Sequence, residues 1–152
     1  MKTTLLDVLR GLCAAGVLLS GVVHLDVWFA GVRGVSVLGP LFLLNFVGGL
    51  ALGVGVVAWR HWLTALLAAG YAATTLVFFY ISVVHGLFGV HETLTGWSQV
   101  LAQVAELTVL VCGLVVVALS SPVRRRGAGR VEPPTASLRV GGSTAARGGW
   151  GE

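Results

Sequence analysis

The chain contains few charged side chains. Only 11% of its 152 residues are Asp, Glu, Lys or Arg, whereas 56% are hydrophobic. An average soluble domain carries about 25% charged residues. So little charge cannot cover the surface of a water-soluble globule of this length. The composition therefore indicates an integral membrane protein.

Cysteine is also scarce, and its placement argues against one class of membrane enzyme. The two cysteines, Cys13 and Cys112, are far apart in sequence and form no C-x-x-C pair. Such pairs are typical of thiol-oxidising sites. We therefore interpret both cysteines as small buried hydrophobic side chains.

The N-terminal region lacks a recognisable cleavage site. Lys2 and Arg10 precede an apolar run over residues 11–23, as in a signal peptide. No small-x-small motif follows that run, so we interpret it as part of an uncleaved first span.

Four apolar stretches approach or exceed the roughly 20 residues that a helix needs to cross the hydrocarbon core. They cover residues 11–30, 38–59, 62–86 and 97–119. Tryptophan belongs at membrane interfaces, and four tryptophans lie near the ends of these stretches: Trp28, Trp59, Trp62 and Trp97. The sequence therefore predicts an all-α fold for residues 1–120, a membrane-spanning four-helix antiparallel bundle.

The basic residues predict the orientation of this bundle. With the N-terminus inside the cell, nine of the ten Lys and Arg residues are cytoplasmic and Arg33 alone lies outside. This distribution follows the positive-inside rule. One lysine against nine arginines also suggests a GC-rich bacterial genome. We therefore expect a multi-pass protein of the bacterial plasma membrane with both termini cytoplasmic.

Residues 121–152 differ in composition from the rest of the chain. They are rich in Gly, Pro, Ser, Thr and Arg, so we expect a disordered basic cytoplasmic tail. Arg124, Arg125 and Arg126 directly follow the last span and are expected to contact anionic lipid headgroups. Because this charge lies beside a membrane segment and no nucleic-acid-binding motif is present, we expect the lipid bilayer, and not nucleic acid, as its partner.

The fourth apolar stretch contains a carboxylate, Glu106, which is costly to place in a membrane and suggests a functional site. Gln99, Gln103 and Glu106 follow i, i+4, i+7 spacing, so they lie on one helix face. Ser20 and His24 share a face of the first stretch in the same way.

The other spans also carry polar side chains toward their outer ends. Lipid cannot solvate these groups, so we expect them to turn toward the interior of the bundle. The sequence therefore predicts one polar pocket in the outer half of the bundle. Its expected members are His24, Asn45, Ser82, His85, Gln99, Gln103 and Glu106.

Three kinds of chemistry fit such a pocket. His24 and His85 on facing helices could be the axial ligands of a haem b. Those histidines, His91 and a carboxylate (Glu92 or Glu106) could instead bind zinc, copper or iron, although the sequence has no HxxxH or HExxH motif. Glu106 and a histidine could also form a protonatable pair for proton-linked transport.

A purely structural role explains the same residues without a cofactor. Hydrogen bonds between helices average about 0.6 kcal/mol in membranes and could fix the register of the bundle. We therefore expect a non-enzymatic accessory or structural component, working in a larger membrane complex or as a homo-oligomer. A haem- or metal-binding redox subunit and a small proton-linked transporter are the alternatives.

Three short pieces of the sequence resemble small four-helix membrane proteins of GC-rich bacteria. These pieces are residues 24–28 (HLDVW), 39–45 (GPLFLLN) and 86–92 (GLFGVHE). The similarity spans about residues 5–120 and excludes the tail. It implies the four-helix fold and a bacterial plasma membrane, and it brings no established activity.

Overall fold

The computed structural model describes residues 2–86 and 96–121, and within these ranges it contains helices and no strand. The long helices are α1 (Lys2–Ala30), α2 (Leu38–Ala58), α3 (Trp62–His85) and α4 (Trp97–Ser120), and a short 3-10 turn, η1 (Val32–Gly34), follows α1. All four are long and apolar enough to cross a membrane. The prediction of an all-helical protein with four long apolar helices is confirmed for the described residues.

Several predicted features lie outside the described residues. They are the tail beyond Ser121, including Arg124, Arg125 and Arg126, and the loop residues His91 and Glu92.

The helix boundaries agree closely with the predicted spans except at the start of α1. This helix begins at Lys2, whereas the apolar stretch begins at Gly11. Hydropathy marks the apolar part of a helix and not the point where its backbone hydrogen bonds begin. The polar first turns contact Arg60 in the connection between α2 and α3. Arg60 pairs with Asp7, and the Arg60 carbonyl accepts a hydrogen bond from Arg10 at 2.8 Å.

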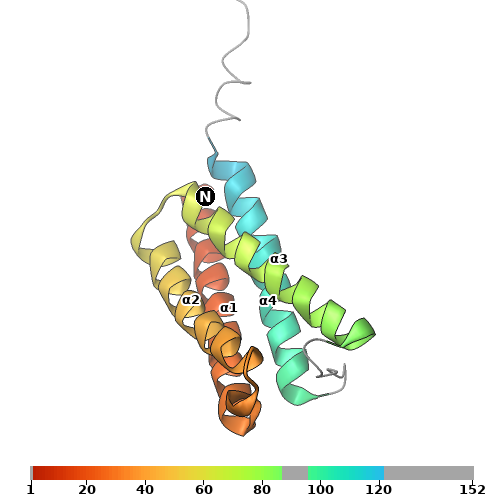
Figure 1. Ribbon diagram of the computed structural model, residues 1–152. Helices are drawn as coiled ribbons and strands as arrows, with labels where there is room; N and C mark the ends of the chain where they lie inside the picture. The colour runs from red at the N-terminus through yellow and green to blue at the C-terminus, as the bar shows by residue number, and fades with distance from the viewer. Residues whose placement is uncertain (1, 87–95, 122–152) are drawn as a thin grey trace, which may run out of the picture.

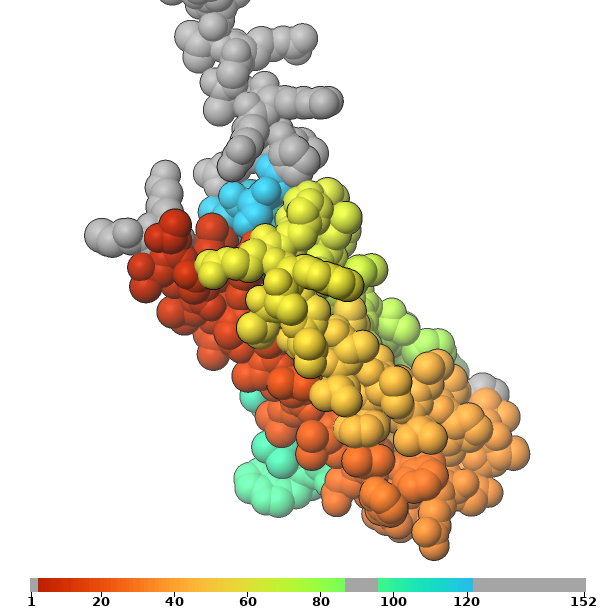
Figure 2. Space-filling view, turned by 90° about the vertical axis from the view of Figure 1, so that its left-hand side faces the viewer, coloured from red at the N-terminus to blue at the C-terminus, as the bar shows by residue number. Residues whose placement is uncertain are grey.

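The helices form a bundle in which α1 packs along both α2 and α4, and α3 packs mainly on α4 (Figure 1). The helices α1 and α2 lie side by side on the face shown in Figure 2. The start of α1, the short connection between α2 and α3, and the end of α4 lie together at what we call the closed end (Figure 1). From that connection α2 and α3 diverge toward the opposite end, the open end (Figure 1).

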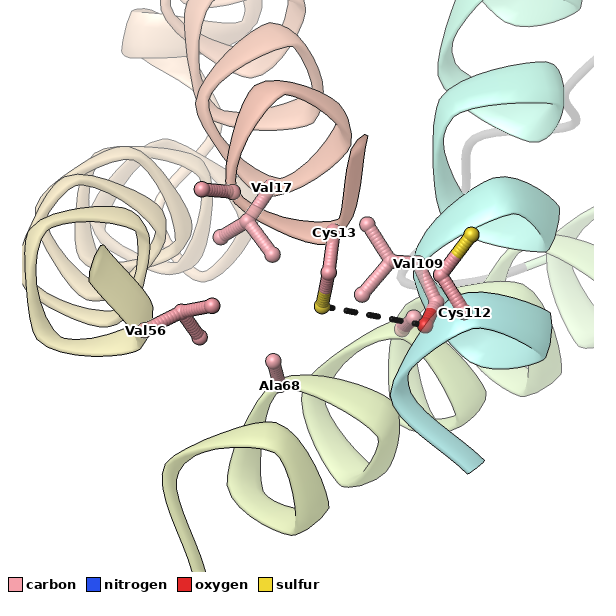
Figure 3. Close-up of a cluster of buried hydrophobic side chains, with 8 residues drawn as sticks. Cys13, Val17, Val56, Ala68, Val109 and Cys112 are labelled. Atoms are coloured by element: carbon pink, nitrogen blue, oxygen red, sulfur yellow. Dashed lines mark hydrogen bonds between the residues drawn. The ribbon is translucent and has the colours of Figure 1, made fainter. Parts of the chain in front are cut away.

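A cluster of small buried side chains contributed by all four helices fills the bundle toward the closed end (Figure 3). Its members are Cys13, Ala14, Val17, Val56, Ala68, Ala72, Val109 and Cys112. The thiol of Cys13 points to the carbonyl oxygen of Val109 at 4.0 Å, and both cysteines are free. Small side chains allow the helix backbones to approach closely, which favours van der Waals packing between apolar helices.

Glycines mark the closest approaches between the helices. A Cβ atom at Gly113 of α4 would lie 2.9 Å from the carbonyl oxygen of Ala65 of α3. A Cβ atom at Gly16 of α1 would lie 2.9 Å from the carbonyl oxygen of Ala105 of α4. Both distances are too short for a real Cβ contact, so these positions require glycine. By contrast, Gly55 on α2 faces open space.

These contacts predict the effect of adding one methyl group to α4. The substitution Gly113→Ala should lower the free energy of unfolding by about 1–3 kcal/mol, because the new methyl group meets the backbone of α3. The matched control, Gly55→Ala, should leave stability unchanged or raise it, because alanine has the higher helix propensity. Thermal denaturation of the detergent-purified variants measures both changes. Equal midpoints for the two variants would contradict the close packing of α3 on α4.

Candidate functional site

The carboxyl group of Glu106 is buried in the middle of the bundle, at the contact between α1 and α4. The Glu106 side chain is 2% exposed, and Ser20 on α1 is 0% exposed. The Ser20 hydroxyl donates a hydrogen bond to Oε1 of Glu106 at 2.9 Å. Because Gly16 lies one turn before Ser20 and directly against α4, the short serine side chain can reach the carboxyl group.

The same polar contact extends to α3 and α2. On α3, the side chain of Thr75 lies near the Glu106 carboxyl group and the Tyr71 hydroxyl lies near Ser20. The Thr75 hydroxyl donates to the carbonyl oxygens of Tyr71 and Ala72, both at 3.0 Å. The Tyr71 hydroxyl also donates to the backbone carbonyl of Asn45 on α2 at 3.2 Å. We call Ser20, Asn45, Tyr71, Thr75 and Glu106, one or two from each helix, the polar network.

His24 adjoins the polar network through α1. Its Nδ1 atom lies 2.8 Å from the carbonyl oxygen of Ser20, one helical turn earlier. A carbonyl oxygen only accepts, so Nδ1 carries the proton in this contact. The imidazole ring also packs against Phe42 of α2, with ring centroids 5.1 Å apart. Ser20 therefore contacts His24 through its carbonyl and Glu106 through its hydroxyl.

A cavity of about 450 Å³ lies next to the polar network, between the diverging parts of α2 and α3. Binding sites for small molecules commonly measure about 300–1,000 Å³ and are mostly apolar with a few polar groups. His24 is the one residue of α1 in the lining. The other lining residues are Leu38, Leu41, Phe42, Leu44, Asn45, Gly48, Tyr71, Thr74, Thr75, Phe78, Phe79 and Ser82.

The polar network bounds one end of this cavity. The hydrogen bond from Tyr71 to Asn45 joins α3 to α2 near the closed-end side of the cavity, within one turn of Gly48. Beyond it, toward the open end, large side chains such as Phe42 and Phe78 line the walls. The cavity exists because the helices diverge there and the described side chains do not fill the space between them.

The structure distributes the seven predicted pocket residues over several places. Three of them, His24, Asn45 and Ser82, line the cavity. Glu106 lies behind the cavity wall in the contact between α1 and α4. His85 ends α3 as an exposed residue and is not part of the lining.

The two predicted glutamines lie near the start of α4. The side chain of Gln103 donates from Nε2 to the carbonyl oxygen of Gln99 at 3.1 Å. Gln99 lines a second, smaller hollow of about 50 Å³, which His24 also borders. This hollow adjoins the cavity, because His24, Phe42 and Phe79 line both, whereas Gln103 lines neither.

The residues predicted to hold haem or a metal ion do not gather into one cluster in the described part of the chain. Within residues 2–86 and 96–121, no three His, Cys, Asp or Glu side chains are placed to hold a metal ion. His24 lines the cavity, whereas His85 is exposed at the end of α3. These two imidazoles therefore occupy different surroundings.

The sequence places Ser20 on the face of His24 but does not assign it to the carboxyl group of Glu106. It also places Tyr71, Thr75 and Phe78 on one inward-turning face of α3, but it does not place Phe42 and Phe79 in the same site. Tyr71, Thr75 and Phe78 follow i, i+4, i+7 spacing on α3, and this pattern is the signal that marks the cavity wall.

No family model matches the chain, and neither a curated protein nor a solved structure is detectably similar to it. Its function is therefore inferred from the geometry of the cavity and the polar network.

The contact between Ser20 and Glu106 predicts a measurable energetic coupling. In a double-mutant cycle, Ser20→Ala and Glu106→Leu should show a coupling of about 0.6 kcal/mol and at most about 1.7 kcal/mol, the range for hydrogen bonds between membrane helices. The free energy of unfolding in mixed micelles is the quantity to measure.

A cycle between Thr108→Val and Glu106→Leu provides the matched control. The Thr108 hydroxyl donates to the carbonyl of Val104 within α4. The changes in the free energy of unfolding caused by Thr108→Val and by Glu106→Leu should therefore be additive. If the two changes in the free energy of unfolding caused by Ser20→Ala and Glu106→Leu simply add, the hydrogen bond between Ser20 and Glu106 is contradicted.

Proposed function

We propose that the protein is a multi-pass protein of the bacterial plasma membrane with both termini on the cytoplasmic side. The four long apolar helices support insertion into a bilayer. The start of α1, the connection between α2 and α3 and the end of α4 lie at one end of the bundle (Figure 1). Arg60 belongs to that connection, and its carbonyl accepts a hydrogen bond from Arg10. Basic residues gathered at one end support its placement in the cytoplasm.

We further propose that the protein is a non-enzymatic membrane component that binds a lipid-soluble molecule between α2 and α3. The single observation that carries this proposal is the cavity of about 450 Å³. Its lining runs from Leu38 to Gly48 on α2, a length of about 15 Å at 1.5 Å per residue. That length is about half of the 30 Å hydrocarbon thickness, so a molecule in the cavity would reside at the depth of the lipid chains.

The geometry gives less support to the alternative functions. A haem with two histidine ligands needs both imidazoles at one iron, whereas His24 lines the cavity and His85 is exposed. A proton carrier needs access to solvent, whereas Glu106 is 2% exposed, accepts a hydrogen bond from Ser20 and lies near Thr75. A binding component could work within a larger membrane complex or as a homo-oligomer.

Filling the cavity tests the binding proposal. Gly48 lines the cavity, and a Cβ atom there would meet nothing within 4 Å, so Gly48→Leu should fold normally and occupy the space. Gly55→Leu is the matched control on the same helix, because Gly55 also faces open space and is not part of the lining.

The proteins should be purified from their native membrane in a mild detergent and examined by native mass spectrometry. Wild type and Gly55→Leu should retain a bound small molecule, and Gly48→Leu should lose it. The proposal fails if wild type carries no bound mass or if all three proteins carry the same one.

The proposed orientation predicts a labelling pattern for single cysteines placed at the two ends of the bundle. In a background with Cys13→Ala and Cys112→Ala, Ser36→Cys lies in the connection between α1 and α2, and Ser121→Cys directly follows α4. A membrane-impermeant maleimide should label position 36 in intact right-side-out vesicles and position 121 only after permeabilisation. The reverse pattern would show the opposite orientation.

A further inference from the structure

The cavity contains no strongly charged side chain. None of its lining residues is Lys, Arg, Asp or Glu, and the nearby carboxyl group of Glu106 faces Ser20 and Thr75 instead. An ionised group placed in lipid is costly unless a partner of opposite charge is present. The lining therefore favours a ligand without a charge.

One polar side chain in this lining is placed to recognise a ligand. Within residues 2–86 and 96–121, Asn45 makes its hydrogen bond through its backbone carbonyl, which accepts from Tyr71, and not through its side-chain amide. This amide is partly buried in a cavity that has mostly apolar walls. An amide offers two donors and an acceptor, and polar groups removed from water are normally hydrogen-bonded. A ligand with a hydroxyl or carbonyl group would supply a hydrogen-bond partner for the Asn45 side-chain amide, which the described side chains do not supply.

Large apolar side chains share the cavity lining with Asn45. Leu41, Phe42 and Leu44 neighbour Asn45 on α2, and Phe78 lies on the facing wall formed by α3. These side chains match a hydrocarbon body attached to a single polar group.

We propose that the ligand is an uncharged amphiphile, with a hydroxyl or carbonyl head that hydrogen-bonds to the side-chain amide of Asn45. Its apolar body lies between Phe42 of α2 and Phe78 of α3. This assignment rests on the proposed binding function and adds the chemical class of the ligand and the residue that recognises its head.

The test uses three probes with the same sixteen-carbon chain and different heads. The full-length protein in phosphatidylcholine vesicles is photolabelled with a diazirine-bearing hexadecanol, and hexadecanol, hexadecane and ionised palmitate compete for the site. We expect the label on α2 and α3. Hexadecanol should compete about two- to tenfold better than hexadecane, the factor that corresponds to one net hydrogen bond. Palmitate should compete less well than hexadecanol.

Two variants separate the possible outcomes. Asn45→Leu should retain labelling and lose the preference for hexadecanol over hexadecane, whereas Gly48→Leu should abolish labelling and Gly55→Leu should not. Suppose that Gly48→Leu abolishes labelling. If wild type then shows no preference for hexadecanol over hexadecane, or if Asn45→Leu keeps that preference, the hydrogen bond between the ligand head and Asn45 is overturned and the binding site stands. If Gly48→Leu leaves labelling unchanged, the binding function itself is overturned.

Discussion

The hydrogen bond from Ser20 to Glu106 is the contact on which the arrangement of the four helices depends. It joins α1 to α4 in the middle of the bundle, and the neighbouring hydroxyls of Thr75 and Tyr71 bring in α3. Tyr71 then connects α3 to α2 through the carbonyl of Asn45. In an apolar surrounding each of these groups needs a partner from the protein. These contacts form only when the polar faces of the four helices turn toward one another.

The polar network also separates two regions with different packing. Toward the closed end, small side chains such as Ala68 and Cys13 fill the interior, and Gly113 allows α3 and α4 to touch. Toward the open end, α2 and α3 separate and leave the cavity between larger side chains. Close packing at one end and a ligand-sized space at the other are therefore two consequences of the same helix divergence.

The number, length and approximate limits of the helices could be predicted from the sequence, because apolar runs of about 20 residues have few alternative folds. The start of α1 could not, since its polar first turns are held by Arg60, a contact distant in sequence. The site was predicted less completely. The polar residues His24, Asn45 and Ser82 do share one cavity, but Glu106 lies behind its wall. Helix spacing shows which residues share a face, and it does not show which neighbouring helix that face meets.

Two pairs of nearby residues show the limit of such reasoning. Ser82 is buried and His85 is exposed, although both lie in the last turns of α3, because the end of α3 has already left the bundle (Figure 1). A Cβ atom at Gly49 would lie 3.1 Å from the carbonyl oxygen of Val17. A Cβ atom at the neighbouring Gly48 would face open space in the cavity. Helix crossing and rotation decide both cases, and neither can be derived from composition or periodicity.

The proposed binding of a lipid-soluble molecule between α2 and α3 requires that lipid can reach this space. A nitroxide spin label at position 48, in the protein reconstituted into vesicles, tests it through collisions with oxygen, which concentrates in lipid, and with a water-soluble nickel chelate. We expect that oxygen reaches the label as readily as it reaches one at the exposed Leu67 of α3, and that the nickel chelate does not. A label at position 48 that oxygen cannot reach, or that the nickel chelate reaches readily, would contradict a cavity open to lipid.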